Sequence, residues 1–155
     1  MSSNDAPSEG FSSLAIHEAA HTVACLVEEG TFRYVTLRPR SRLSEGHIYG
    51  MRRIGVVARG VISLAGPFAE AILLGDGDRG ELPTLIKAGS SVDMDDVDAL
   101  GLSEEDLTLV YDGAVRLVDE YWEDIVMVAE LLEKRRTLTM GEVYQAMWAV
   151  RSDVA

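Results

Sequence analysis

The chain has 155 residues with 26 acidic and 14 basic side chains, which gives a formal net charge of −12. Its length is typical of one domain, and its hydrophobic share of 47% with a charged share of 26% is ordinary for a globular protein. A pI of about 4.6 disfavours broad binding to nucleic acids or anionic membranes, which requires positive potential. The single cysteine, Cys25, excludes an internal disulfide framework and a cysteine-based zinc finger.

The N-terminal sequence is polar and acidic, and we expect a flexible tail over residues 1–11 ahead of a single domain over residues 12–155. It lacks the basic and then apolar pattern of a secretory signal. The longest apolar stretch, Val61–Leu74, is interrupted by Gly66, Pro67 and Glu70 and is shorter than the ~20 residues that a spanning helix needs. These features predict a cytoplasmic protein with no membrane span.

Hydrophobic periodicity and turn residues predict a helix-rich chain with one small sheet. Ser12 or Ser13 can cap the first helix, Gly30 can end it, and Pro67 should kink or break the second. The expected elements are, in chain order, a helix over Ser13–Glu29, strands over Thr31–Leu37 and Gly46–Arg52, a helix over Gly55–Leu74, a short helix from Ser90 to Leu100, a long helix over Ser103–Arg135 and a last helix over Thr139–Arg151. The pattern predicts an α+β fold, mostly α-helical, with a two- to three-stranded sheet and a C-terminal helical bundle.

The most informative string is His17-Glu18-Ala19-Ala20-His21, an HExxH pattern on the first predicted helix. Residues four apart lie on one helix face, so the two imidazoles can bind one zinc ion. Glu18 is turned toward the same side, where it can act as general base on a zinc-bound water that attacks a peptide carbonyl. The alternative is a pair of core histidines on an amphipathic helix.

Two histidines leave a zinc ion under-coordinated, so a third ligand is needed. A third histidine in an extended HExxHxxGxxH pattern is excluded, because Ala24 and Val27 occupy the two positions in question. Glu45 has nearly the spacing of a thermolysin-type ligand but lies in a predicted turn, and His47 lies on a predicted strand. Cys25 is one turn beyond His21 and is more typical of a small core residue.

Asp93 is the better candidate for the third ligand. It begins a predicted helix after a glycine-rich segment, which can carry it to the metal site. Its alternative role is that of a capping carboxylate at a helix start, within a cluster of aspartates that could form a solvated acidic face.

The order of several strings resembles the FtsH-type zinc metalloprotease domain from about Ser12 to Val150. AIHEAAHTVA resembles the HEAGH helix of that family, YVTLRPRSRLSEGHIYG its short strands and proline-arginine turn, and SLAGPFAEAILLG its LGGRAAEELIFG helix. GSSVDMDDVDAL resembles its GASNDxxxAT segment, and the tail resembles its closing helices. The resemblance implies a soluble or modular peptidase domain with a bound Zn²⁺ ion.

The resemblance also implies roles for individual residues. His17, His21 and Asp93 would bind zinc, Glu18 would be the catalytic base, and Glu70 would lie near the metal without binding it and orient a ligand imidazole. Ala20 replaces the glycine usual in the family, and Val92 replaces the asparagine before the ligand aspartate. Family members carry a membrane anchor and an ATPase module ahead of the protease, and neither fits before Ser12, so we expect activity without an ATPase of its own.

The leading hypothesis is a zinc endopeptidase that acts on unfolded or loosely structured polypeptides. Substrate would lie along the exposed strand of the sheet, where His47 and Tyr49 are candidate substrate-binding residues. The alternative is a catalytically silent or regulatory protein-binding module that retains a zinc site. A homo-oligomer, a separate ATPase or an adaptor are candidate partners.

Charge is unevenly distributed along the chain. Residues 31–60 carry seven arginines and one acidic residue, Glu45, whereas residues 93–133 carry one arginine and fourteen acidic residues. Nucleic-acid binding through the arginines is disfavoured, because only Phe32, Tyr34 and Tyr49 accompany them as aromatic residues. The separation of charge predicts self-assembly or recruitment of a charged polypeptide.

Overall fold

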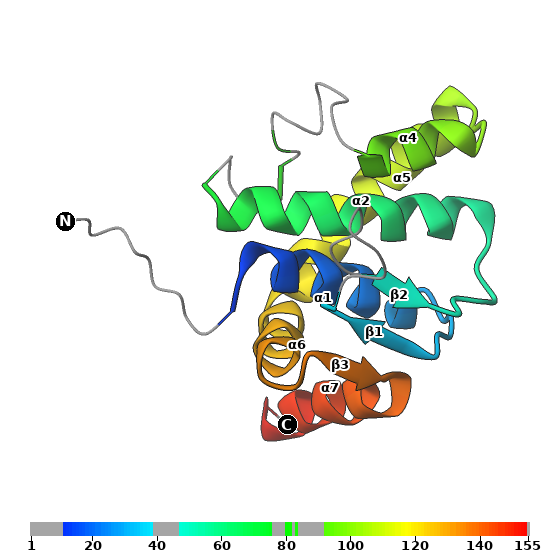
Figure 1. Ribbon diagram of the computed structural model, residues 1–155. Coiled ribbons are helices and arrows are strands. Elements are labelled where there is room, and N and C mark those ends of the chain that lie inside the picture. Colours follow the sequence, from blue (N-terminus) through cyan, green and yellow to red (C-terminus); the bar gives the residue numbers. More distant parts are fainter. Residues whose placement is uncertain (1–10, 39–46, 76–79, 82, 84–91, 155) are drawn as a thin grey trace.

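The computed structural model describes residues 11–38, 47–75, 80–81, 83 and 92–154 (Figure 1). This part of the chain is mostly helical with one small antiparallel sheet, which confirms the predicted α+β, mainly helical class. Its elements are α1 (Ser13–Val27), β1 (Tyr34–Thr36), β2 (His47–Tyr49), α2 (Val56–Leu73), α4 (Val92–Ala99), α5 (Glu104–Glu120), α6 (Trp122–Arg135), β3 (Thr137–Thr139) and α7 (Met140–Val154).

The sheet has the strand order β2-β1-β3. The central strand β1 therefore lies between β2, which precedes α2 in the chain, and β3, which follows α6. β1 pairs with both neighbours antiparallel, with Val35 opposite Ile48 on one side and Leu138 on the other. Strand β3 was not expected from the sequence, because three residues between two helices are too few to show an alternating pattern. Its Leu138 is fully buried and anchors the strand to the core.

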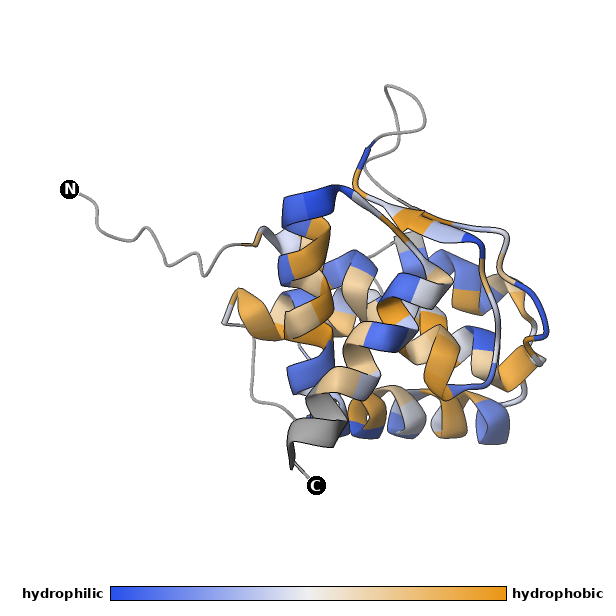
Figure 2. Cartoon of the chain, turned by 90° about the horizontal axis from the view of Figure 1, so that it is seen from below, coloured by the Kyte–Doolittle hydropathy of each residue, from blue (hydrophilic) through white to orange (hydrophobic). Residues whose placement is uncertain are grey.

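Helices α1 and α2 form the centre of the fold, with α6 against α1 and α5 against α2 (Figure 1). Their contacts bury aliphatic and aromatic side chains such as Ile16, Val23, Leu64 and Phe68. Figure 2 shows apolar and polar residues side by side on the helices, as expected for amphipathic helices around one core. His17, Glu18 and His21 therefore lie on a helix that packs against both α2 and α6 at the centre of the fold.

The beginning of α1 is capped as predicted, but its end is not the predicted one. The Ser12 hydroxyl accepts a hydrogen bond from the Ala15 amide at 3.2 Å, as an N-cap does. The helix ends at Val27, and Glu29 adopts the left-handed conformation with a φ of 64°. Gly30 is buried instead, and a side chain there would overlap Ile54. Its amide closes the end of α1 on the Cys25 carbonyl at 2.8 Å, while its lack of a side chain allows the close packing.

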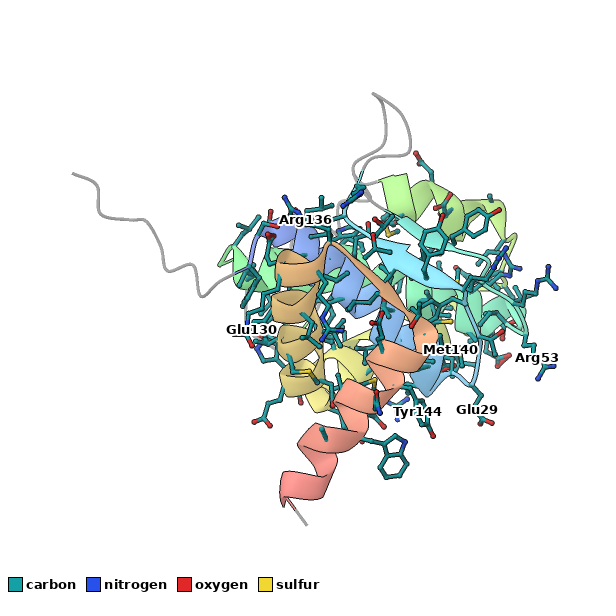
Figure 3. The ribbon with its side chains drawn as sticks, turned by 60° about the horizontal axis from the view of Figure 1, so that its bottom comes forward. Glu29, Arg53, Glu130, Arg136, Met140 and Tyr144 are labelled. Carbon is teal, nitrogen blue, oxygen red and sulfur yellow. The ribbon has the colours of Figure 1, made fainter. Side chains whose placement is uncertain are left out.

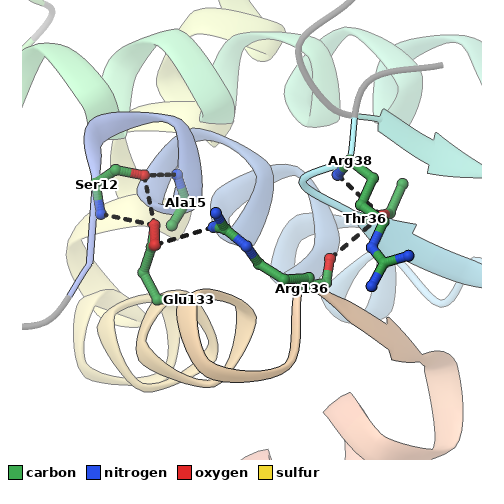
Figure 4. Close-up of polar contacts among 6 residues, drawn as sticks. All are labelled: Ser12, Ala15, Thr36, Arg38, Glu133 and Arg136. Carbon is green, nitrogen blue, oxygen red and sulfur yellow. Dashed lines mark hydrogen bonds and ion pairs between the residues drawn. The ribbon is translucent and has the colours of Figure 1, made fainter.

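Figure 4 shows a polar network that joins the start of α1 to the end of α6 and to β1. Glu133 accepts a hydrogen bond from the Ser12 hydroxyl at 2.7 Å and forms an ion pair with Arg136 at 3.2 Å. The Arg136 carbonyl in turn accepts from the Thr36 hydroxyl at 3.2 Å. These contacts fix the entry of α1 relative to the sheet.

Helix α2 is continuous through Pro67, so of the predicted kink or break, the break is wrong. Among the described residues it is the one helix with the length and hydropathy to cross a membrane, with a mean hydropathy of 1.6 and half of that window buried. Core helices share this composition, so the absence of a membrane span stays a prediction.

The long helix expected over Ser103–Arg135 is two helices, α5 and α6, which meet at Tyr121. Tyr121 has φ −106° and ψ 22°, its amide closes α5 on the Leu117 carbonyl, and its own carbonyl begins α6. The apolar period runs across this junction, so the sequence pattern did not reveal it. The last helix begins as predicted, since the Thr139 hydroxyl accepts from the Glu142 amide and Glu142 accepts from the Thr139 amide.

Candidate metal centre

Three side chains that are far apart in the sequence meet at one point between α1, α2 and α4. His17 and His21 lie one turn apart on α1, and Asp93 lies in the first turn of α4. One potential ligand atom from each lies within 4.8 Å of the others, and all three side chains are partly buried. The structure thus brings together the three residues that the sequence predicts as metal ligands, as a group that could hold a metal ion.

The distances within this group suit a four-coordinate metal. The Asp93 Oδ2 atom lies 3.1 Å from His17 Nε2 and 3.6 Å from His21 Nε2. A tetrahedral zinc site with ligand bonds of roughly 2.0–2.1 Å places its ligand atoms about 3.3 Å apart. The two observed distances bracket this value, so the Asp93 oxygen lies near a tetrahedral spacing from each imidazole, and all three ligand atoms lie within 4.8 Å of one another.

The other nitrogen of each imidazole is held by α2. His17 Nδ1 lies 2.7 Å from Glu70 Oε1, and His21 Nδ1 lies 2.7 Å from the Ile62 carbonyl oxygen. Both oxygens can only accept, so each Nδ1 carries the hydrogen. In the neutral imidazole this leaves the Nε2 lone pair free to bind a metal, in the arrangement that metal-binding histidines typically have.

Gly66 of α2 packs directly against the two imidazoles. A Cβ atom at this position would overlap His21 Nε2 and would lie 2.5 Å from His21 Cε1 and 2.9 Å from His17 Cδ2. No side chain fits there without displacing the rings. The close approach of α2 therefore depends on this glycine, and Glu70, one turn along, reaches His17 from the same helix.

Glu18 lies between the two histidines in the sequence and is 6% exposed. Its side chain makes no hydrogen bond with another residue of the described part of the chain, while its negative charge contributes to raising the pKa of His17. The carboxylate is thus enclosed next to the histidine pair, and its oxygen atoms make no hydrogen bond with a residue of the described part of the chain.

The electrostatics describe the metal-free state of the group. Burial alone would lower the pKa of His17, but hydrogen bonds to Asp93 and Glu70 outweigh it and raise that pKa from 6.5 to about 10. Burial alone would raise the pKa of Asp93, but hydrogen bonds from His17 and His21 hold it well below its usual range. A proton on His17 Nε2 therefore occupies the place that a metal would take.

The remaining candidates lie elsewhere or outside the described residues. Cys25 is fully buried, and burial raises the pKa of its thiol to about 11, which agrees with the predicted core role. Tyr49 is 37% exposed on β2, where its ring stacks on Tyr34 with centroids 5.1 Å apart. His47 contributes its backbone to β2, and its side chain is outside the described part of the chain. Glu45 and Ser90, the predicted start of the short helix, are also outside it.

Two contributors to the site were missed by the sequence interpretation. The Ile62 carbonyl could not be found, because a backbone oxygen carries no sequence signal. Gly66 could have been suspected from its place in the helix interior, where glycine costs about 1 kcal/mol relative to alanine and so calls for a packing reason.

Comparison with known proteins adds no further constraint, since no protein-family model and no curated protein matches this chain.

Proposed function

We propose that the protein is a zinc-dependent endopeptidase of the FtsH type that acts on unfolded or loosely structured polypeptides. The observation that carries this proposal is the tautomer arrangement of the site. Glu70 and the Ile62 carbonyl hold both Nδ1 atoms at 2.7 Å, so both Nε2 atoms face the Asp93 carboxylate. Two imidazole nitrogens and one carboxylate oxygen with an open fourth position form the usual ligand set of a catalytic zinc site.

The donor set favours zinc over magnesium or calcium, which prefer oxygen ligands in larger numbers. His17, His21 and Asp93 would hold the ion, and Glu70 would keep the His17 ring in place. When bound, zinc would polarise a substrate carbonyl and lower the pKa of a water molecule.

The chain itself supplies the base. The Glu18 carboxylate would accept the proton of the attacking water at one of its oxygen atoms and later donate it to the leaving amine. Its enclosure next to His17 excludes bulk water from this transfer. The edge strand β2 would bind an extended stretch of substrate through main-chain hydrogen bonds, with the exposed ring of Tyr49 beside it. This mode of binding explains the expected preference for unfolded polypeptide.

The test combines metal content with a single substitution. We expect about one zinc ion per chain in the purified protein and cleavage of a fluorescently labelled unfolded polypeptide. Glu18→Gln should retain zinc but lose roughly 10²–10⁴-fold in activity, as removal of a general base does. Glu105→Gln, on the exposed face of α5, is the matched control and should keep full activity. A protein that binds no zinc when intact would refute the proposal.

The same pair of variants separates the peptidase from a regulatory module with a silent zinc site. In such a module Glu18→Gln would leave the measured function unchanged, while His17→Ala would lose zinc and thermal stability. Retention of an enclosed carboxylate at position 18 supports the peptidase, because a purely structural site needs no base.

A further inference from the structure

A second concave feature lies away from the candidate metal centre, at the end of α1. A cavity of about 190 Å³ opens between the last turn of α1, the junction of α5 with α6, and α7. Its lining is apolar and aromatic, and we call it the aromatic pocket; its residues are Leu26, Val27, Tyr121, Tyr144, Met147 and Trp148.

The rim of the aromatic pocket exposes two large aromatic side chains. Tyr144 is 50% exposed and Trp148 is 55% exposed, one turn apart on α7, with ring centroids 6.1 Å apart. Met147, at 9% exposure, lies below them and belongs to the core. Tryptophan and tyrosine around a partly enclosed floor are the residues that dominate binding energy at protein interfaces.

The size of the aromatic pocket indicates what it can hold. Sites for small-molecule ligands usually measure about 300–1,000 Å³. A volume of about 190 Å³ is below this range and suits one or two side chains of a polypeptide. The pocket is therefore fitted to a peptide segment that inserts a large apolar residue.

The charges around the aromatic pocket select among such segments. Exposed or half-exposed acidic residues stand next to its lining residues in the chain, with Glu28 and Glu29 after Val27, and Glu120 and Glu123 on either side of Tyr121. Figure 3 shows Glu29 and Tyr144 in the lower right part of the view. The stretches 26–29, 119–124 and 140–149 contain no lysine or arginine.

The nearest basic group along α6 is at the far end of that helix. Lys134 and Arg135 lie in its last turn, and Arg136 caps it, roughly 20 Å from Tyr121 at 1.5 Å per residue. In Figure 3 Arg136 is labelled in the upper part of the view and Tyr144 in the lower part. Arg135 and Arg136 are also paired with Glu142 and Glu133. Acidic residues thus outnumber basic ones next to the lining residues in the chain, where Arg116 of α5 and Arg151 of α7 are the nearest basic residues.

We propose that the aromatic pocket binds a segment of another polypeptide in which a large apolar side chain is flanked by lysine or arginine. The apolar side chain enters the pocket beside the Tyr144 and Trp148 rings, and the basic residues pair with the acidic rim. This docking site is separate from the metal centre and does not depend on the proposed peptidase activity.

The experiment uses a labelled peptide of alternating lysine and serine with one central leucine, followed by fluorescence anisotropy. We expect saturable binding that weakens as salt is raised, because the rim charges are exposed. A peptide with glutamate in place of lysine, or serine in place of leucine, should bind at least tenfold more weakly. Absence of binding by the lysine-leucine peptide up to millimolar concentration overturns the proposal.

Substitutions locate the binding. Trp148→Ala and Tyr144→Ala should each lower affinity by about tenfold or more, and Glu28→Gln with Glu29→Gln should reduce the salt dependence. Leu109→Ala is the matched control, since Leu109 is 52% exposed on α5 and does not line the pocket.

Two outcomes would assign the pocket to another occupant and overturn the proposal. If Trp148→Ala leaves affinity unchanged, the peptide binds elsewhere. If sedimentation shows a dimer that Trp148→Ala dissociates, the pocket is an interface between copies of this chain. Melting curves of each variant confirm that the half-exposed substitutions leave the fold intact.

Discussion

Gly66→Ala is the sharpest perturbation that the structure offers. In the interior of a helix this change normally adds about 1 kcal/mol of stability, because alanine is the better helix former. Here the new methyl group would lie 2.5 Å from His21 Cε1 and 2.9 Å from His17 Cδ2, whereas ordinary contact begins at 3.4 Å. The imidazole of His21 must therefore move by roughly 1 Å, several times the ~0.2 Å tolerance of a zinc–ligand bond.

We expect Gly66→Ala to lower zinc affinity by at least ten- to a hundredfold, the range seen when the support of a ligand is lost. Cobalt substitution measures this directly, because the visible spectrum of Co²⁺ reports both affinity and coordination geometry. Competition with zinc then gives the zinc affinity. The variant should lose the spectrum of a tetrahedral site even at cobalt concentrations that saturate the wild type.

Gly55→Ala is the matched control on the same helix. It lies at the N-cap of α2, and a Cβ atom there meets nothing within 4 Å. It should keep wild-type cobalt and zinc binding. If Gly66→Ala gains about 1 kcal/mol of stability and keeps its zinc affinity within twofold, the placement of α2 against the histidines is wrong.

Three further predictions concern protons and the support of His17. Glu70→Gln should lower zinc affinity by about ten- to a hundredfold in the same cobalt assay, because a carboxylate no longer holds the His17 ring, and unchanged affinity would contradict the 2.7 Å contact. Since the pKa of His17 is raised to about 10, its imidazole is protonated at pH 7, and zinc binding should release about one proton. Calorimetry in buffers of different ionisation enthalpy measures this proton release, and a binding heat that does not depend on the buffer would argue against it. In chelator, the His17 contribution to stability should be fully present below pH 6.5 and disappear as pH rises through about 10, because the folded pKa exceeds the unfolded one. The Asp93 contribution to stability should be present above its ordinary pKa of 3.8 and disappear on acidification, since its folded pKa is lowered. Urea titrations across the pH range measure the His17 and Asp93 contributions, and a free energy of unfolding that does not change with pH would contradict the ion pair.

The sequence predicts part of the group formed by His17, His21 and Asp93, because the spacing of the two histidines along the helix is a local signal. His17 and His21 are four apart, so the helix alone places them on one face. Asp93 is remote in the sequence, and spacing alone left Glu45 and His47 as alternative third ligands. The resemblance to a known family favoured Asp93, and the structure brings it within hydrogen-bonding distance of His17.

The features that the sequence did not reveal depend on long-range packing. Strand β3 exists because Thr137–Thr139 pairs with Tyr34–Thr36, about a hundred residues earlier in the chain. The turn at Tyr121 interrupts a helix whose apolar period continues unbroken. Pro67 is tolerated within α2, although proline removes one helical hydrogen bond. In each case tertiary contacts outweigh local preference, and a single sequence does not show those contacts.

The position of Asp93 has a consequence for the chain as a polymer. The protein has one cysteine, so it cannot form an internal disulfide. An ion held by His21 and Asp93 would instead join positions roughly 70 residues apart, but only in the folded chain, because the unfolded chain does not bring these ligands together. The free energy of binding the ion would then add to the free energy of unfolding. Loss of the metal would change the folding equilibrium of the entire protein as well as its chemistry.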